Sequence, residues 1–411
     1  MKFFADFHIH SAYSRATSPD MTIPSISHWS KLKGIKLIGT GDFTHPAWLQ
    51  ELKEQLIPVE GNLFKYDETY FILTAEVSNI YHKHNKIRKI HNLIFVPTFD
   101  AVDRMNSLLG KYGKLSSDGR PIILLDSEIM VKKILELVPD AFIVPAHIWT
   151  PWFSLFGSQS GFDTIEECFG NETAHIGALE TGLSSDPPMN WLWSELDRLA
   201  LLSNSDAHSP KNIAREANCL ECELNYADII SAIKSKDRFL FTIEFFPEEG
   251  KYHWDGHRKC GTRIAPAESI ANNNICPNCG KPITIGVMHR VIMLSDRDKP
   301  RNNRIPCHHL IPLTEIIADV LGVSKETKKV ANEYDKLIHS WTELDCLLHI
   351  PYKELQNITQ DEIAYSICAV REGKVDILPG YDGVYGKISV KRSELLLKRE
   401  TLKDRQQQKL F

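Results

Sequence analysis

The chain has 411 residues, of which 43% are hydrophobic and 25% charged, a composition typical of a globular protein with one large domain and one or two small ones. No run of about 18 apolar residues is present, so the sequence predicts no membrane-spanning helix. The formal net charge of −5 argues against non-specific nucleic-acid affinity over the whole surface. The chain opens directly with a strand-like run, so we expect no secretory leader and a cytoplasmic location.

Positive charge is concentrated in the second half of the chain. Residues 251–304 contain ten Lys and Arg against four Asp and Glu, which gives a local charge of +6. Residues 387–409 contain eight against three, which gives +5. The remaining residues are therefore acidic, and we predict that the second half contacts phosphate groups.

Seven short apolar runs within the first 205 residues predict strands, and helical patterns such as 127–138, 165–169 and 189–199 lie between most of them. This alternation predicts an α/β fold with a parallel sheet, and seven such units wind most simply into a closed or nearly closed barrel. In such barrels the chemistry lies at the C-terminal ends of the strands. The runs are 2–6, 35–39, 70–76, 90–96, 141–145, 177–180 and 200–203.

Each of these runs ends in, contains or precedes a His, Asp or Glu. His8 and His10 follow the first run and point to the same side, because residues two apart on an extended backbone share a face. One such residue is ordinary, but seven coincidences at one end of a barrel predict a metal site. The mixture of imidazoles and carboxylates suits Zn²⁺, Mn²⁺ or Fe²⁺, and we predict two or three ions with a bridging carboxylate. The other residues are Asp42 with His45, Glu76, His91, His147, Glu180, and Asp206 with His208.

A second metal site is predicted between residues 250 and 285. Cys276 and Cys279 have the spacing of a zinc knuckle, and His257 and Cys260 supply a second pair with the same spacing. This pattern predicts a structural tetrahedral Zn²⁺ site, with His253 as the competitor of His257. A module of this size cannot bury a core and is held together by its metal instead.

The chain after this module has helical patterns over 312–349 and 360–371 and candidate nucleic-acid contacts. The basic loop 295–304 is either a phosphate contact or an ordinary solvated loop. The turn 380–386 contains two tyrosines, which either stack on a nucleobase or pack internally. Candidate DNA-binding residues are Trp152, Arg290, Arg297, Arg301, Tyr381 and Tyr385.

The strand-end motifs resemble those of the PHP (polymerase and histidinol phosphatase) family over about residues 1–245. The resemblance lies in Asp6-Phe-His-Ile-His-Ser11, Gly41-Asp42, Ala75-Glu-Val77, His91, Ala146-His147 and Ser205-Asp-Ala-His208. It implies a distorted seven-stranded barrel whose trinuclear metal site hydrolyses phosphoesters. The family usually has Asp-His where this chain has Asp42-Phe43, so either His45 substitutes or Asp42 binds alone.

The resemblance places the metal ligands and the catalytic groups on the same strand ends. Glu76, His147, Asp206 and Asp42 are the predicted catalytic residues, with Glu76 as the bridging carboxylate. The predicted ligands are His8, His10, Asp42, Glu76, His91, His147, Asp206 and His208.

The order of all motifs, from the barrel through Cys276-Pro-Asn-Cys-Gly-Lys281 to Pro379-Gly-Tyr-Asp-Gly-Val-Tyr-Gly386, resembles the endonuclease Q family over essentially the full chain. That family nicks DNA on the 5′ side of hypoxanthine, uracil, xanthine and abasic sites. The resemblance implies a catalytic barrel (1–245), a zinc module (250–285) and a mainly helical DNA-binding region (286–411). It also implies Zn²⁺ in both sites, or Mg²⁺ or Mn²⁺ for activity.

Lesion recognition requires the damaged base to leave the stack, because its altered edge is otherwise paired. Trp149, Trp152 and Phe153, just after His147, are candidate walls of a lesion pocket. The expected partners are damaged DNA, double- or single-stranded, and a sliding clamp is a further candidate. Two alternatives remain open: a small-molecule phosphoesterase of the histidinol-phosphate type, and a zinc-containing nucleic-acid-binding protein without activity.

Overall fold

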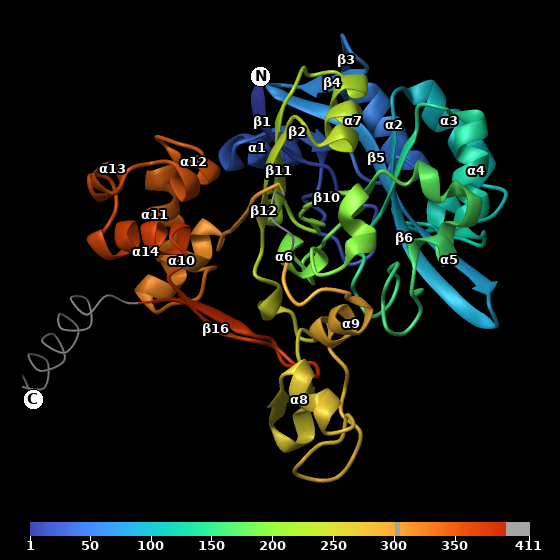
Figure 1. Ribbon diagram of the computed structural model, residues 1–411. Coiled ribbons are helices and arrows are strands. Elements are labelled where there is room, and N and C mark those ends of the chain that lie inside the picture. The colour runs from blue at the N-terminus through green and yellow to red at the C-terminus, as the bar shows by residue number, and fades with distance from the viewer. Residues whose placement is uncertain (301–304, 392–411) are drawn as a thin grey trace, which may run out of the picture. The chain divides into compact units, whose positions relative to one another are not determined.

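The computed structural model describes residues 1–300 and 305–391, which form two compact units (Figure 1). The first unit comprises residues 1–308 together with 379–386. The second comprises residues 309–378 together with β17 (Lys387–Val390). The predicted Arg301 and the basic tail beyond residue 391 lie outside the described residues.

All seven predicted apolar runs form strands of the first unit, and the α/β fold class is confirmed. Two of the strands are longer than predicted, because the third and fourth runs continue into a hairpin. The strands are β1 (Lys2–Asp6), β2 (Ile35–Gly39), β5 (Thr69–Lys83), β6 (Lys86–Val96), β8 (Phe142–Pro145), β9 (Ala178–Glu180) and β10 (Ala200–Leu202).

The prediction of a parallel sheet is wrong at β6. The pairs β1–β2, β2–β5 and β9–β10 are parallel, but β6 runs antiparallel to both β5 and β8. The cause is the connection from β5 to β6, a two-residue turn at His84 and Asn85 with φ of 53° and 58°. Two residues with positive φ make a tight hairpin, whereas a parallel connection needs a long crossover. The first half of β6, including His91, therefore lies toward the end of the sheet at which β1 and β2 finish.

Individual hydrogen bonds connect the strands of the barrel at the two places where neighbouring strands do not form a regular ladder of backbone hydrogen bonds. The Ile148 amide donates to the Glu180 carbonyl at 3.0 Å, which joins the ends of β8 and β9. The Phe7 amide donates to Asn204 Oδ1 at 3.0 Å and the His10 amide donates to the Ala207 carbonyl at 3.0 Å. The segment after β10 is thereby tied to the end of β1. The seven strands thus form a distorted barrel of mixed strand direction.

Further strands extend the barrel sheet on both sides. On the free edge of β1, β11 (Ala217–Glu221) and β12 (Phe239–Glu244) add antiparallel. The short strands β3 (Ile57–Val59), β4 (Leu63–Tyr66) and β7 (Ile122–Ile123) flank β5, and β15 (Cys307–His309) follows β12.

The barrel strands bury a continuous apolar core. Phe7, Phe95 and Phe142 are almost fully buried and contact one another in series, with ring centroids 5.4 and 5.6 Å apart. Burying each such side chain stabilises the fold by about 1.5–3 kcal/mol.

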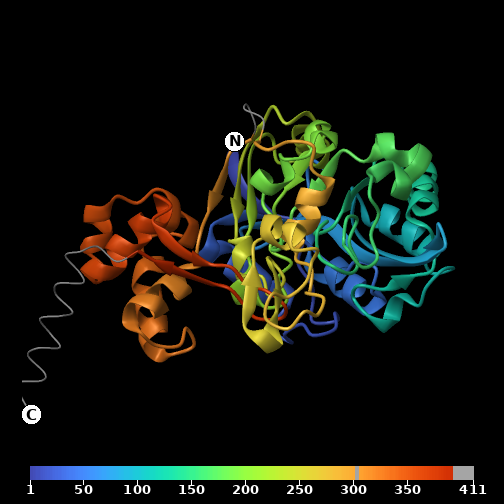
Figure 2. The ribbon, with the colours of Figure 1, turned by 60° about the horizontal axis from the view of Figure 1, so that its bottom comes forward.

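Helices cover the outside of the barrel, and Figure 2 shows α3 and α4 side by side next to the β5–β6 hairpin. The helices are α1 (Ile23–Lys33), α2 (Pro46–Gln55), α3 (Phe99–Leu109), α4 (Ser127–Leu137), α5 (Ile165–Phe169), α6 (Pro187–Asn190) and α7 (Tyr226–Ser235). The helix predicted over 189–199 is replaced by α6 and a separate 3-10 turn at Ser194–Arg198.

The region around the predicted zinc site has little core of its own. It consists of β13 (Asp255–His257), β14 (Thr262–Ile264) and α8 (Pro266–Ala271), and it is followed by α9 (Val287–Leu294). Its buried apolar cluster contains Ile264, Cys276 and Ile283. Residues 379–386 are attached to it, since the Trp254 amide donates to the Gly380 carbonyl at 2.9 Å and Thr284 Oγ1 to Asp382 at 2.6 Å.

The second unit is helical, as predicted for 312–349 and 360–371. The carboxylate of Glu343, at the start of α12, accepts a hydrogen bond from the Leu313 amide at 3.1 Å and from the Tyr334 hydroxyl at 2.8 Å, which ties three helices together. Its elements are α10 (Leu313–Leu321), α11 (Lys328–Ile338), α12 (Glu343–Leu348), α13 (Tyr352–Gln356), α14 (Asp361–Arg371) and the hairpin β16 (Val375–Leu378) with β17.

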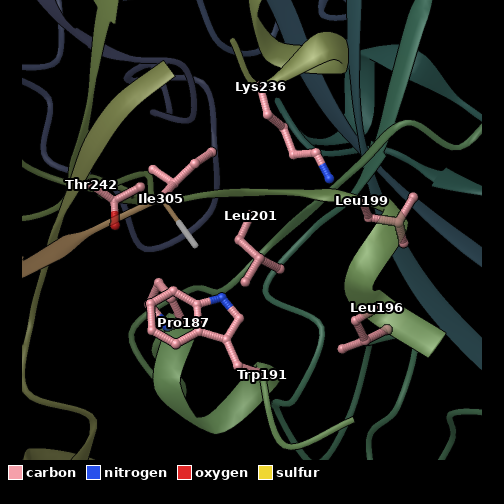
Figure 3. Close-up of a pocket in the computed structure, with 8 residues that line it drawn as sticks. All are labelled: Pro187, Trp191, Leu196, Leu199, Leu201, Lys236, Thr242 and Ile305. Carbon is pink, nitrogen blue, oxygen red and sulfur yellow. The ribbon is translucent and has the colours of Figure 1, made fainter. Parts of the chain in front are cut away.

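Two further features bear on function. Among the described residues, no helix is long and apolar enough to cross a membrane. A small pocket that none of the predicted metal ligands lines has Pro187 and Trp191 on one side, and the Lys236 side chain reaches in from the opposite side (Figure 3). Its volume of about 40 Å³ admits a few water molecules but not a nucleotide.

Candidate metal centre

The two histidines that follow β1 are fixed by carboxylates, so that both rings present the same atom to the site. His8 Nδ1 lies 3.0 and 2.9 Å from the two carboxylate oxygens of Glu180, and His10 Nδ1 lies 2.9 Å from Asp42 Oδ1. Both rings are fully buried. A carboxylate on Nδ1 selects the tautomer in which Nε2 has a free lone pair, which is the arrangement found around metal-binding histidines.

Glu76, which points from β5, is the centre of the cluster. Its Oε1 atom lies 2.6 Å from His91 Nδ1 and 2.9 Å from His147 Nε2. Its Oε2 atom lies 3.4 Å from His8 Nε2 and 3.3 Å from His10 Nε2. One carboxylate thus faces two separate pairs of imidazoles, which is the geometry required of a bridging ligand.

The predicted ligands form three overlapping groups whose donor atoms lie within 4.8 Å of one another. Glu76 belongs to two of these groups, and His10 also belongs to two. The groups are His8 with His10 and Glu76, His10 with Asp206 and His208, and Glu76 with His91 and His147.

The hydrogen bonding of the cluster fits metal ions. The Nε2 atoms of His8 and His10 and Oδ1 of Asp206 are buried and have no hydrogen-bond partner among the described residues. A buried polar atom without a partner costs about 1–3 kcal/mol. A cation would satisfy all three atoms at once, because each presents a lone pair and His10 Nε2 lies only 3.0 Å from Asp206 Oδ1.

Three of the site residues have strained backbones. Asp42, His147 and Asp206 have φ of 47°, 31° and 46°, in the left-handed region that residues other than glycine seldom occupy. Each such residue costs about 1–3 kcal/mol and persists only where the surrounding structure imposes it. Here the strain turns each side chain inward at the end of a strand.

Burial and neighbouring charges set the protonation of the acids. Burial alone would raise the pKa of Glu76, but His91, Arg120 and His8 outweigh it and hold that pKa well below its usual range. Burial likewise opposes the ionisation of Asp206, whose pKa is nevertheless lowered by the neighbouring imidazoles of His10 and His8. Both carboxylates are therefore ionised near neutral pH, which is the form that binds a metal ion.

Asp42 and His45 occupy different positions. Asp42 is fully buried and its second oxygen, Oδ2, accepts hydrogen bonds from the Ser11 amide at 2.6 Å and the Ser11 hydroxyl at 2.7 Å. It lies behind His10 and outside the three groups of candidate ligands. His45 stacks on Tyr13, with ring centroids 4.6 Å apart, and precedes α2. Asp42 as a direct ligand therefore stays a prediction, and His45 does not join the groups.

No specific role was predicted from the sequence for two residues of the site. Glu180 was recognised as a strand end but not as the residue that orients His8. Arg120, whose Nη1 atom lies 3.1 Å from Glu76 Oε2, had no sequence signal, because it follows a short turn in a non-periodic loop. The available signal for Glu180 was its position as the last residue of the sixth barrel strand, where the other strands also end in site residues.

The second predicted site also comes together. His257, Cys260, Cys276 and Cys279 form one group, in which His257 Nδ1 lies 3.4 Å from Cys279 Sγ. His253, the alternative ligand, is buried elsewhere and is not part of this group. Burial raises the pKa of the Cys276 thiol, but hydrogen bonds from Thr262 and nearby backbone amides outweigh it and lower the pKa to about 6. A thiolate at neutral pH is ready to bind Zn²⁺.

The candidate DNA-binding residues divide into paired and exposed groups. Arg297 forms a two-point ion pair with Asp197 at 2.9 and 2.7 Å, and Arg290 donates to the Phe156 carbonyl at 3.0 Å, so both tie the segment after the zinc module to the barrel. Tyr381 lies in the turn attached to Trp254. Trp152 and Tyr385 are exposed, at 49% and 70%.

Comparison with known proteins gives the chain relatives over its whole length. A family model described as the MJ0043 C-terminal domain matches residues 312–374. The protein MJ0043 of Methanocaldococcus jannaschii is 36% identical over 262 residues, which is 61% of this chain but 32% of MJ0043, so the match covers about a third of that relative. The protein YqxK of Bacillus subtilis is 30% identical over 94% of this chain and 99% of its own length.

Two solved structures match nearly the full chain. One is the lesion-specific endonuclease PfuEndoQ of Pyrococcus furiosus, with a TM-score of 0.87 and 34% identity over 96% of this chain and 97% of that one. The other is endonuclease Q in complex with a 27-mer duplex that has an abasic lesion at the active site, with a TM-score of 0.84 and 33% identity over 95% and 97%. At this identity and coverage the likeness extends beyond the fold. The chain belongs to the endonuclease Q family.

Proposed function

We propose that this chain is a metal-dependent endonuclease that cuts damaged DNA on the 5′ side of deaminated bases and abasic sites. The observation that supports this proposal most directly is the set of three ligand groups that share Glu76 and His10, with buried donor atoms that lack partners. Such a set suits several metal ions held side by side, as hydrolysis of a phosphodiester requires. Endonuclease Q has been crystallised with an abasic duplex, which supports damaged DNA as the substrate.

The residues of the site would have two different roles, metal binding and the orientation of the metal-binding histidines. His8, His10, Asp206 and His208 would hold metal on one side of Glu76, with His91 and His147 on the other. Glu180 and Asp42 keep the rings of His8 and His10 in the tautomer that exposes Nε2. Divalent ions, when bound, lower the pKa of a water molecule and neutralise charge on the phosphate. Metal analysis of the purified protein distinguishes Zn²⁺, Mn²⁺ and Mg²⁺.

The proposed reaction consumes one water molecule. Its oxygen forms a bond to phosphorus while the bond from phosphorus to the 3′ oxygen of the preceding nucleotide breaks. One proton of the water passes to that leaving oxygen. The products are a 3′-hydroxyl on the upstream strand and a 5′-phosphate on the lesion nucleotide.

Selection of the lesion would depend on access to the damaged base. Trp152, which follows His147 by five residues and is half exposed, is the candidate wall residue with most free surface. A base turned out of the duplex could stack on its ring, since stacking on an aromatic side chain is worth about 1–3 kcal/mol per base. Contact with a sliding clamp stays a separate prediction.

The test is a nicking assay on a 5′-labelled duplex with one deoxyinosine or one abasic site, with Mg²⁺ or Mn²⁺. We expect a single cut just 5′ of the lesion, no cut in the undamaged duplex, and no cut by the His8→Ala variant. Intact lesion DNA with every metal would contradict the proposal. Phosphate release from small phosphomonoesters would then favour the small-molecule phosphoesterase, and binding of DNA with about one zinc per chain would favour a non-catalytic binding protein.

A further inference from the structure

Arg120 supplies a positive charge at the metal centre that the proposed set of metal ligands does not use. Its Nη1 atom lies 3.1 Å from Glu76 Oε2, and its side chain is 26% exposed while that of Glu76 is fully buried. The guanidinium therefore reaches from the surface to the central carboxylate. Among the described residues, Glu76 is the only hydrogen-bond partner of this guanidinium.

The backbone that presents Arg120 is fixed from several sides. The Gly119 amide donates to the Tyr13 carbonyl at 3.0 Å, and the Gly119 carbonyl accepts from Thr44 Oγ1 at 3.1 Å. The Arg120 amide donates to Asp118 Oδ1 at 3.1 Å. On the other side, the Pro121 carbonyl accepts from the Ser78 amide of β5 at 2.9 Å. Arg120 is thus held between the loop after β1 and the strand of Glu76.

Gly119 also brings this segment unusually close to the site. A Cβ atom at Gly119 would lie 2.3 Å from Asp42 Oδ2 and 2.4 Å from Ser14 Oγ, so there is no room for a side chain. The backbone just before Arg120 therefore packs directly on the carboxylate that orients His10. Such a placement fixes the position of a guanidinium in advance, which is what recognition of a substrate group requires.

A structural role for Arg120 accounts for part of this arrangement. Its charge pairs with Glu76, and a buried carboxylate without a partner would be costly. However, Glu76 already has His91 and His147 at 2.6 and 2.9 Å on Oε1. An ion held by His8, His10 and Glu76 would supply a second positive charge there. The guanidinium, with five donors and one contact, would then be available to another anion.

We infer that Arg120 binds a non-bridging oxygen of the scissile phosphate and stabilises the negative charge that develops there during cleavage. This inference rests on the proposed function and names a residue for it. A guanidinium suits the role because its planar fork of N–H groups matches two phosphate oxygens and stays charged at every working pH. Removing one charged donor of this kind typically slows a reaction by about 10²–10³-fold.

The experiment compares Arg120→Ala and Arg120→Lys with the wild type and with Arg104→Ala as a matched control. Arg104 is exposed on α3, where it pairs with Asp100 and donates to the Leu137 carbonyl, and it contacts no described residue of the metal centre. Three quantities are measured in each: the metal content per chain, the nicking rate on the abasic duplex with saturating metal, and the affinity of the metal-loaded protein for inorganic phosphate.

We expect unchanged metal content in all variants, with nicking by Arg120→Ala slower by about 100-fold. Its dissociation constant for inorganic phosphate should rise at least about tenfold, since the loss of one charge-assisted contact is worth about that factor. The nicking rate and phosphate affinity of Arg120→Lys should lie between those of the wild type and Arg120→Ala, because lysine keeps the positive charge but lacks the planar fork of N–H groups. Arg104→Ala should match the wild type.

Two results would overturn the inference. One is nicking and phosphate affinity unchanged in Arg120→Ala. The other is a loss of bound metal that accounts for the slower cleavage and is reversed by excess metal, which would make Arg120 a structural partner of Glu76. If the wild type does not cut any lesion, the proposed function fails, but phosphate affinity still decides the role of Arg120. If Arg120→Ala does not fold, Arg120→Lys and Arg120→Gln supply the same comparison.

Discussion

At the residue scale, the candidate site depends on carboxylates that hold imidazoles as much as on the imidazoles themselves. Glu180 is a clear case. Its two oxygens lie near His8 Nδ1, and they also accept hydrogen bonds from the His147 amide at 3.0 Å and from Asn204 Nδ2 at 2.9 Å. All three of these groups donate to the Glu180 carboxylate. A single buried carboxylate thereby sets the positions of one histidine from the first strand and one from the fifth.

We expect Glu180→Gln to weaken metal binding and nicking by about 10–100-fold, which is the usual effect of losing such a partner. The glutamine amide group would place N–H donors against donors, and it would favour the His8 tautomer whose Nε2 bears a proton and cannot bind metal. Metal affinity by calorimetry and nicking rates at several metal concentrations measure the effect. Glu221→Gln, an exposed glutamate on β11, is the control, and equal metal affinity in the two variants would contradict this role.

At the scale of elements, the link between β5, α4 and the turn after α5 depends on one glutamate. Glu128, in the first turn of α4, lies 3.0 Å from Lys83 Nζ at the end of β5 and accepts a hydrogen bond from the Asn171 amide at 3.1 Å. Burial alone would raise the pKa of Glu128, but these contacts outweigh it and lower the pKa below its usual 4.5. A lowered pKa in the folded state means that the ionised form stabilises the fold above pH 4.5, and that this stabilisation is lost as the pH falls through the folded-state pKa.

Glu128→Gln should therefore destabilise the barrel unit near neutral pH and have little effect in acid. A partly exposed pair of this kind is worth about 1 kcal/mol, which corresponds to about 2 °C in melting temperature for a unit of this size. Thermal melts at about pH 7 and at a pH well below the usual glutamate pKa measure the difference. Glu136→Gln, on the exposed side of the same helix, should show neither effect. A loss of melting temperature in Glu128→Gln that is larger in acid than at about pH 7 would contradict the stabilising role of ionised Glu128.

The zinc module should depend on its metal for its structure, because its buried core is so small. We expect Cys276→Ser to lose one zinc per chain and to make residues 250–285 sensitive to limited proteolysis, while the barrel keeps its melting transition. Metal analysis and mass spectrometry of the fragments measure both. Cys368→Ser, a thiol in the second unit, should keep the full zinc content. Retention of zinc by Cys276→Ser would show that the group His257, Cys260, Cys276 and Cys279 does not act as one site.

The elements were largely predictable from the sequence, whereas their directions and partners were not. All seven apolar runs are strands, because strands buried on both faces read as short continuous apolar runs. The reversal of β6 escaped prediction, since it depends on two residues, His84 and Asn85, that carry no strong turn signal. The position of His91 near the start of its run was the one sign of that reversal.

The site was predictable for residues that end strands and not for those that come from loops. His8, His10, Glu76, His91, His147, Asp206 and His208 were selected by position alone, and the structure brings their donor atoms together. Arg120 lies in a loop, and loops have no period. Arg297 was selected for its charge, but its ion pair with Asp197 joins residues 100 positions apart, which no local pattern reveals.

At the scale of the whole molecule, charge is divided along the chain. The two basic stretches sum to +11, so the rest of the chain has −16 for the total of −5. An acidic barrel holds cations well but repels the DNA backbone. The basic stretches, residues 251–304 and 387–409, would then supply most of the attraction to DNA.

DNA binding should accordingly depend strongly on salt. We expect His8→Ala not to cut, so its binding can be measured alone, and its affinity for the abasic duplex should fall at least about tenfold between about 50 and 200 mM KCl. An undamaged duplex should be bound more weakly but with the same slope, because phosphate contacts have no sequence information. Fluorescence anisotropy at several salt concentrations measures both. An affinity that does not change with salt would contradict a binding surface built from the basic stretches.

The order of strands in the barrel also has a consequence for synthesis of the protein. β1 lies between β2 and β11, so this strand has no partner on one side until residues 217–221 have been synthesised. The cluster of metal ligands around His8 and His10 is likewise incomplete until Asp206 has been synthesised. At about 5–20 residues per second, a ribosome needs roughly 10–40 s to supply those partners. During that time an apolar strand edge is exposed on the nascent chain, and folding must join segments some 200 residues apart, which is intrinsically slow. The metal centre cannot assemble on the ribosome before residues 206–208 have been synthesised, and chaperone binding to β1 would protect the strand during that interval.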